Sequence, residues 1–272
     1  MSREIAILID GGFLTKRLQR LVETPDKLTP HNVCGIIRSI CREHVRKLTD
    51  DKDSNWHKHI YRIFYYDAPP FTGQAHHPLS RKQINYAKSD QAIFQNALFG
   101  LLKKQRNMAL RLGTLSKLSG WTIQSERLVR LLRTRTLIQE LAALPTLADG
   151  SMNVSAEQVQ AMQANAAIWS RLEDWMVQLD LRQKGVDMRI GLDIASITLK
   201  RQASTIILIA GDADFVPAAK LARREGIQFI LDPLWQSVSD DLFEHIDGLQ
   251  TVLKRPETGA RTGDDEGPAA TA

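Results

Sequence analysis

Residues 205–215, TIILIAGDADF, place two carboxylates directly behind a short apolar run. The run TIILI has the length and the β-branched composition of a buried strand, and Gly211 breaks it. Asp212 and Asp214 follow one residue apart, a pattern poorly suited to core packing. A single aspartate at a strand end is more often a turn former or a helix cap than a ligand. Asp214 is itself placed to cap a helix that begins at Phe215.

The rest of the chain alternates strand-like and helix-like segments around this stretch. Short apolar runs predict strands at 4–9, 59–66, 108–113, 205–209 and 227–231, and helical spacing predicts helices at 31–48, 83–106, 187–200 and 214–225. Such alternation favours an α/β fold in which a mostly parallel sheet is covered by helices on both faces. From about 121 to 183 the pattern predicts helix throughout.

Other aspartates share the predicted location of the first pair. In a parallel sheet, ligands bind beyond the carboxyl ends of the strands. Asp10 follows the first predicted strand and Asp212 follows a later one, so the two acids meet at one sheet edge if both strands are central. In KGVDMRIGLDIAS, Asp187 stands at the start of a helix and Asp193 lies further along it.

Clustered carboxylates repel each other, and the usual remedies are a bound cation or a raised pKa. Ligands that are all oxygen favour a hard divalent ion, and Mg²⁺ is typically held by one or two carboxylates together with substrate phosphates. Such an ion polarises a phosphodiester and activates a water, so the chemistry needs no nucleophilic side chain. The acids therefore form a candidate metal site. The alternative is that each of them only forms a turn or caps a helix.

Four segments together resemble the NYN domains, and more narrowly their bacterial LabA-like branch. They are ILIDGGFL at 7–14, RIFYYDAPP at 62–70, KGVDMRIGLDIAS at 184–196 and IILIAGDADFVPAAKLARREG at 206–226. The NYN family belongs to the PIN-like nucleases, so the resemblance implies a Rossmann-like three-layer α/β/α fold. It also implies a metal-dependent endoribonuclease, a hydrolase that uses Mg²⁺ or Mn²⁺ held by clustered aspartates to cut RNA, or alternatively DNA.

The resemblance also assigns individual residues. Asp10, Asp187, Asp212 and Asp214 fall on the acidic positions of the family, which implies catalytic and metal-binding roles. Asp193 matches the second acid of the KGVD helix, and we expect it to support the metal from outside the innermost ligands. Many relatives have Asn three residues after the first Asp, whereas this chain has Phe13.

Basic residues supply candidate contacts to a phosphate backbone. Residues 101–135 hold nine Lys or Arg against one acid, Glu126. The alternative is an ordinary solvated helix surface. The candidate substrate contacts are Arg81, Lys82, Lys184, Arg127 and Arg130.

Composition limits the class of protein. The 272 residues are 43% hydrophobic with a net charge of +5, and no apolar run approaches the length of a membrane span. We expect no membrane partner and a cytoplasmic location with reduced thiols at Cys34 and Cys41. No GxGxxG, phosphate-loop, GxSxG or zinc-ligand spacing is present.

The expected organisation is one domain over residues 1–254, with a helical insertion at about 115–183 and a disordered tail at 255–272. Two hypotheses of another class stay open. One is a module that keeps the NYN fold and binds RNA, or regulates a partner, without cleaving. The other is a homo-oligomer contact made by the helical insertion.

Overall fold

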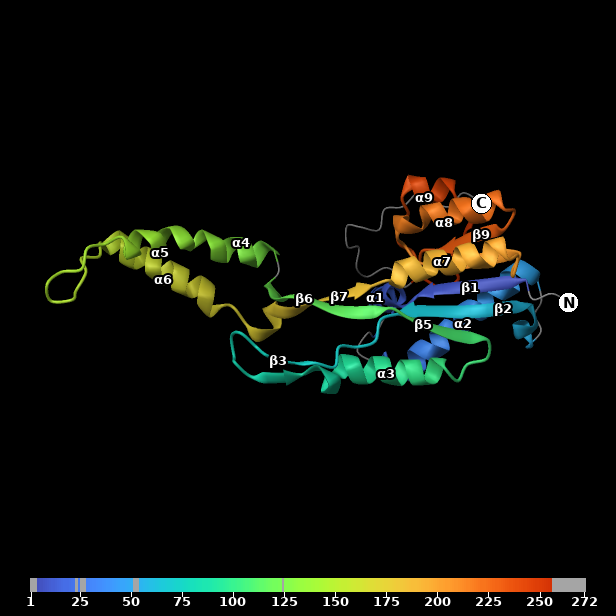
Figure 1. Ribbon diagram of the computed structural model, residues 1–272, viewed down its shortest axis with the longest axis horizontal. Coiled ribbons are helices and arrows are strands. Elements are labelled where there is room, and N and C mark those ends of the chain that lie inside the picture. Colours follow the sequence, from blue (N-terminus) through green and yellow to red (C-terminus); the bar gives the residue numbers. More distant parts are fainter. Residues whose placement is uncertain (1–3, 23, 25–27, 51–53, 124, 256–272) are drawn as a thin grey trace. The chain divides into compact units, whose positions relative to one another are not determined.

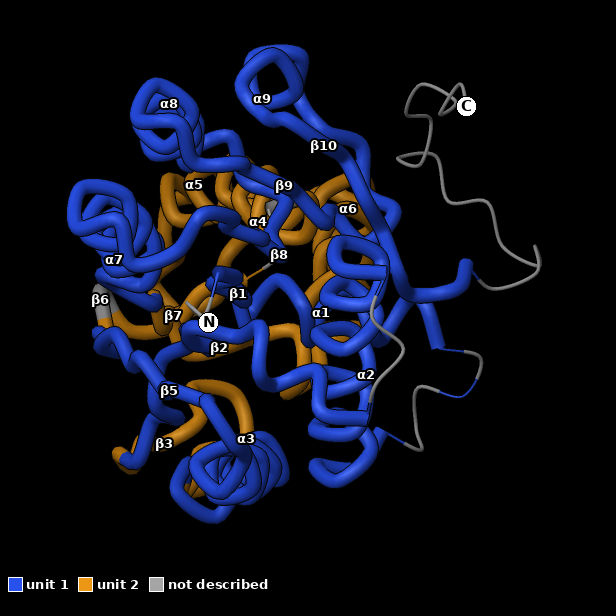
Figure 2. The backbone as a smooth tube through the Cα atoms, turned by 90° about the vertical axis from the view of Figure 1, so that its right-hand side faces the viewer, with its two compact units in different colours: residues 1–72, 86–116, 183–272 blue, residues 73–85, 117–182 orange. Residues whose placement is uncertain are grey.

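The computed structural model describes residues 4–22, 24, 28–50, 54–123 and 125–255, and the expected tail lies outside them from residue 256 on. The chain divides into two compact units, shown in different colours in Figure 2. Unit 1 comprises Met1–Thr72, Tyr86–Ser116 and Gln183–Ala272, and unit 2 comprises Gly73–Asn85 and Lys117–Arg182.

Unit 1 is built on a six-stranded parallel sheet in the order β10-β9-β8-β1-β2-β5. In chain order the strands are β1 (Ile5–Asp10), β2 (Ile60–Asp67), β5 (Met108–Leu112), β8 (Thr205–Ile209), β9 (Gln228–Asp232) and β10 (Gly248–Leu249). Strand β1 lies at the centre, where Ile9 pairs with Ile209 of β8 on one side and with Tyr65 of β2 on the other. The strands predicted from apolar runs are confirmed within a residue or two at each end.

Helices cover both faces of this sheet, which gives three α/β/α layers (Figure 1). Side chains alternate across β1, so Ile5, Ile7 and Ile9 face one layer while Ala6 and Leu8 face the other. The first layer contains α1 (Gly11–Leu21), α2 (Pro30–Thr49) and α3 (Asp90–Leu102), and the second contains α7 (Val186–Leu199), α8 (Val216–Arg224) and α9 (Asp240–Glu244). The predicted fold class is confirmed. None of the described helices is long and apolar enough to cross a bilayer.

Unit 2 corrects the prediction of helix throughout 121–183. Helices α4 (Ser125–Arg133), α5 (Arg135–Ala142) and α6 (Ala156–Ser170) are present, but β6 (Thr114–Ile123) and β7 (Val177–Lys184) pair as a two-stranded sheet. In β7 the apolar side chains alternate, with Val177 and Leu179 buried and Gln178 exposed between them. Leu179 also fits helical spacing from Met176, so periodicity alone is ambiguous over such a short stretch.

The predicted helix 83–106 is also too long at its start. A hairpin of β3 (Gln74–His76) and β4 (Gln83–Asn85) precedes it, and α3 begins only at Asp90. Ser89 caps α3, because its Oγ accepts a hydrogen bond from the Ala92 amide at 3.2 Å.

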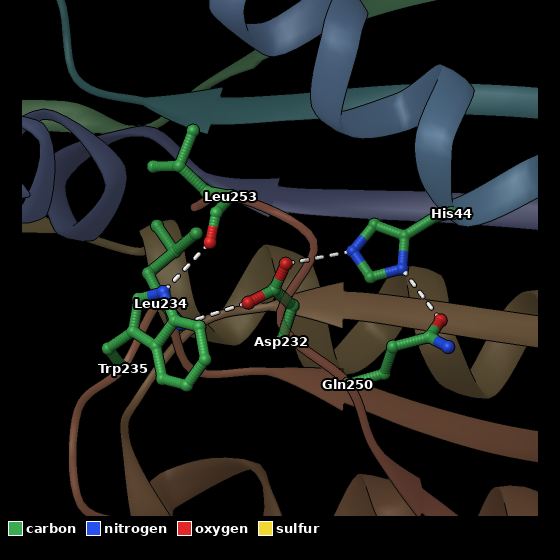
Figure 3. Close-up of polar contacts among 6 residues, drawn as sticks. All are labelled: His44, Asp232, Leu234, Trp235, Gln250 and Leu253. Carbon is green, nitrogen blue, oxygen red and sulfur yellow. Dashed lines mark hydrogen bonds and ion pairs between the residues drawn. The ribbon is translucent and has the colours of Figure 1, made fainter. Parts of the chain in front are cut away.

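A buried polar chain anchors the turn that follows β9 (Figure 3). Asp232 Oδ2 lies 2.8 Å from His44 Nε2, and both side chains are fully buried. His44 Nδ1 lies 3.2 Å from Gln250 Oε1, while Asp232 Oδ1 accepts from the Leu234 amide at 2.9 Å. Leu234 and Trp235 both have left-handed backbones, with φ of 47° and 64°. Non-glycine residues rarely adopt this conformation, so the carboxylate of Asp232 is needed to hold the turn.

We predict that His44→Ala lowers the free energy of unfolding by about 3–5 kcal/mol, because it leaves the Asp232 carboxylate buried without its partner. Urea unfolding followed by circular dichroism measures this loss. The control is Glu43→Gln on the same helix, which breaks the exposed pairs with Arg42 and Arg46 and costs less than about 1 kcal/mol. Equal losses in the two variants would contradict the structural role of the buried pair.

Candidate functional site

The carboxyl ends of three neighbouring strands in unit 1 lead into aspartates. Asp10 is the last residue of β1, Asp67 is the last residue of β2, and Asp212 follows β8 by three residues. Since β1 is paired in parallel with both β2 and β8, the three acids lie at the same edge of the sheet. Asp187 reaches this edge from the first turn of α7.

Asp10 is held in place by the helix that follows it. Its Oδ1 accepts a hydrogen bond from the Phe13 amide at 3.0 Å, so Asp10 caps α1. Burial raises the pKa of Asp10, and the charge of Asp187 raises it further, while Lys16 offsets this only weakly. A Cβ at Gly11 would lie 2.5 Å from the ring of Tyr65, so glycine is what allows α1 to start this close to β2.

Asp67 is a candidate site residue that the sequence reasoning missed. Its side chain is only 3% exposed. Its Oδ1 accepts from the Ala68 amide at 2.7 Å and from the side-chain amides of Gln183 at 3.3 Å and Gln95 at 3.5 Å. Burial raises the pKa of Asp67 to about 6, and the charge of Asp10 adds to the rise. The available signal was its position, since RIFYYD ends a strand in an aspartate just as IAILID does.

Asp187, Asp212 and Asp214 interact electrostatically. Burial raises the pKa of Asp187, and the charges of Asp212 and then Asp214 raise it further. The three acids of the KGVD and GDADF segments are therefore brought close to one another. Together with the influence of Asp187 on Asp10 and of Asp10 on Asp67, five carboxylates form one interacting group.

The cap predicted for Asp214 is wrong. Helix α8 begins at Val216, and its cap position is Phe215, which makes no side-chain capping hydrogen bond. Asp212 is the capping residue instead, because its Oδ1 accepts from the Asp214 amide at 3.1 Å and so caps the short 3₁₀ turn Ala213–Phe215. The side chain of Asp214 is thereby left exposed at the sheet edge.

Asp193 is engaged elsewhere on the sheet. Its Oδ2 accepts a hydrogen bond from the Tyr66 hydroxyl at 2.8 Å and lies 3.3 Å from Arg111 Nε. Burial and the Asp193 carboxylate both raise the pKa of Tyr66, which keeps its hydroxyl a donor. These contacts tie α7 to β2 and β5, and none of them involves another acid of the group.

The predicted basic contacts fall in both units. Lys184 ends β7 in unit 1 and is exposed. Arg81 and Lys82 lie in the tight turn between β3 and β4 of unit 2, where Arg81 has a φ of 58° and the Lys82 carbonyl accepts from the His77 amide. Arg127 and Arg130 lie on α4 of unit 2.

Within the described part of the chain, three side chains of the kinds that can ligate metals come together at one place. They are Asp241, Glu244 and His245 at α9, and their potential ligand atoms lie within 4.8 Å of one another. Asp241 there already lies 4.0 Å from Lys220 and 3.7 Å from His245. Among the described residues, no three of the acids at the sheet edge come this close together.

We predict that Asp67 makes the protein less stable as pH rises when no metal is present. The folded chain keeps the Asp67 proton up to about pH 6, whereas the unfolded chain releases it near the ordinary value of 3.8. Stability therefore falls as pH rises through this window, by about 3 kcal/mol for this residue.

Asp67→Asn cannot ionise, so in EDTA its unfolding free energy should fall less between pH 4 and pH 7 than that of the wild type. Urea unfolding at several pH values measures the difference. Glu157→Gln, a change at an exposed carboxylate of α6, is the control and should leave the wild-type profile unchanged. A profile for Asp67→Asn that matches the wild type would contradict the raised pKa.

Residues 135–249 match the family model of the NYN domain. The match includes Asp187, Asp193, Asp212 and Asp214, while Asp10 and Asp67 lie before it. No curated protein and no solved structure matches the chain. NYN domains belong to the PIN-like nuclease superfamily, whose three-layer α/β/α architecture unit 1 has. Over residues 135–249 the chain is therefore similar to the NYN domain.

Proposed function

We propose that this protein is a metal-dependent nuclease, and most specifically an endoribonuclease that hydrolyses RNA phosphodiesters. The observation that carries the proposal is the group of five interacting carboxylates, Asp10, Asp67, Asp187, Asp212 and Asp214, at the carboxyl edge of the sheet. Ligands of α/β sheets bind at this edge. The resemblance to the LabA-like branch supports RNA as the substrate, and the presence of only two cysteines supports a cytoplasmic location.

The residues present fit a divalent metal ion. The donors are all carboxylate oxygens, which suits Mg²⁺ or Mn²⁺. Burial first, and the charges of neighbouring acids second, raise the pKa values of Asp10, Asp67 and Asp187, so the protein itself does not favour their ionised forms. A bound cation would stabilise the ionised carboxylates, and it would supply Lewis-acid activation of a phosphodiester and of an attacking water.

The chain's own groups preorganise these ligands. The Phe13 amide orients Asp10, the Asp214 amide orients Asp212, and the amides of Gln95 and Gln183 orient Asp67. Each contact uses the Oδ1 atom, which leaves the Oδ2 atom of the same carboxylate for a cation. Holding ligand oxygens in place before the cation arrives lowers the cost of assembling the site.

A second candidate function is an RNA-binding module that does not cleave. It is favoured by Phe13, whose ring carbon would lie 2.6 Å from a Cβ at Gly211. The ring therefore packs against the backbone beside Asp212, at the position where many relatives have a polar Asn. An apolar group there removes one contact to metal or substrate. The cleavage assay below separates the two candidates.

We predict that Asp212→Asn lowers RNA cleavage by more than about 100-fold in Mn²⁺ or Mg²⁺ and leaves the fold intact. The Asn side chain keeps an oxygen that can accept from the Asp214 amide, so the 3₁₀ turn is preserved. The assay compares end-labelled RNA and DNA of the same sequence in parallel, and reactions with EDTA serve as the blank. Full activity in the variant would refute the metal site.

Metal binding has its own readout in the melting temperature. Mn²⁺ should raise the melting temperature of the wild type increasingly as its concentration exceeds Kd, and it should raise that of Asp212→Asn much less. Glu157→Gln, which likewise removes one negative charge but at an exposed acid of α6, should behave as wild type in both assays. Metal stabilisation and RNA binding without cleavage in the wild type would favour the non-cleaving candidate.

We further predict that Asp193→Asn lowers the stability of the protein, because it weakens the contacts with Tyr66 and Arg111, but keeps the Mn²⁺-induced rise in melting temperature. Thermal melts with and without Mn²⁺ measure both effects. Loss of the Mn²⁺ effect would instead make Asp193 a direct ligand.

A further inference from the structure

Unit 2 contains a pocket of about 300 Å³ between α4, the end of α6 and the turn that follows α6. Three arginines line it, Arg127, Arg130 and Arg171. Its apolar floor includes Leu131, Ile168 and Leu172. A volume of this size is at the lower limit of small-molecule sites and is comparable to one nucleotide.

The positive charge of this pocket is not neutralised locally. Within the part of the chain that the structure describes, none of the three arginines forms an ion pair with a carboxylate. The acids nearest to Arg171 along the chain are used elsewhere. Glu173 accepts a hydrogen bond from Trp175 Nε1, and Asp174 Oδ1 lies 3.2 Å from His77 Nδ1.

Arg127 is also oriented by an aromatic ring. Its guanidinium lies 4.8 Å from the ring centroid of Trp175, whose side chain is 56% exposed. A guanidinium stacked on a ring keeps its in-plane N–H groups free to donate, and these fit two phosphate oxygens at once. The exposed indole is at the same time a surface on which a base can stack.

The walls of the pocket are held together by a buried hydroxyl. Thr134, between α4 and α5, is 2% exposed, and its Oγ1 donates to the Leu131 carbonyl at 2.7 Å. The same oxygen accepts from Trp169 Nε1 of α6 at 3.3 Å. These hydrogen bonds fix Arg130 and Leu131 against the helix that carries Ile168, so the walls of the pocket are preorganised by unit 2 itself.

We propose that this pocket anchors the backbone of single-stranded RNA, with one phosphate on the guanidinium groups, its ribose or base on the apolar floor and a neighbouring base on Trp175. The proposal rests on the proposed function in taking RNA as the ligand. A protein partner is less well matched, because three like charges around so small a pocket suit a compact anion and the pocket area is far below that of a stable protein interface.

The test is the binding of a labelled single-stranded RNA 12-mer, followed by fluorescence anisotropy in EDTA and in the Asp212→Asn background, so that no cleavage occurs. Arg130→Gln and Arg171→Gln should each raise Kd about tenfold. Each should also reduce the slope of log Kd against log salt by about 0.7, the value for one lost phosphate contact on a single strand. Trp175→Leu should raise Kd with little change in that slope.

The matched control is Arg133→Gln, which removes the same charge from an exposed position of the same helix, outside the pocket lining. It should change Kd less than about twofold. Equal losses of RNA affinity in Arg133→Gln and Arg130→Gln would mean that the RNA is held by non-specific electrostatic attraction, which would overturn the proposal. Unchanged binding in all variants would also overturn it. A fall in solution mass on Arg130→Gln with unchanged RNA binding would assign the pocket to a contact between copies and also overturn it.

The same variants separate this proposal from the proposed function. If the pocket anchors RNA, Arg130→Gln raises KM for cleavage and leaves kcat near the wild-type value, because the acids are untouched. Failure of the metal site would appear instead as an absence of cleavage with RNA binding intact.

Discussion

Parallel pairing of β1 with both β2 and β8 is the constraint on which the candidate site depends. It places the ends of three strands side by side, and with them Asp10, Asp67 and the loop that carries Asp212. Helix α7 then adds Asp187 through its first turn. No pair of these acids is close in sequence except those of the GDADF segment, so the pairing of the sheet is what makes them neighbours.

Bringing carboxylates together in a partly buried place has an electrostatic cost, which appears as the raised pKa values of Asp10, Asp67 and Asp187. At the same sheet edge, Asp232 differs from these acids because both of its carboxylate oxygens have protein partners, His44 and the Leu234 amide. Asp232 is thus committed to structure, since it holds a turn with two left-handed residues. The other acids keep an oxygen for a ligand, and this difference in partners separates a candidate site residue from a structural one.

The pocket of unit 2 brings together positive charges instead of negative ones. Arg127, Arg130 and Arg171 lie around an apolar floor, while Glu173 and Asp174 are bound to other side chains. A group of acids in unit 1 and a group of arginines in unit 2 are the kinds of site that a cation and a phosphate backbone would respectively stabilise. A nuclease needs both, one to act on the phosphodiester and the other to hold the strand.

The sequence by itself determined the layered α/β fold, because β1, β8 and β9 are short apolar runs and α2 and α7 have clear helical spacing. It also pointed to Asp10, Asp187, Asp212 and Asp214, since each follows a strand or starts a helix. Only the tertiary structure decided three further matters: that Asp67 joins the acids, that Asp193 is paired with Tyr66 and Arg111, and that Arg171 lines the same pocket as Arg130. The physical reason is that periodicity reports which face of an element is buried, whereas the partner of a polar side chain depends on elements that are distant in the chain. For the same reason β7 was mistaken for helix, because its two buried residues fit both periods until pairing with β6 is known.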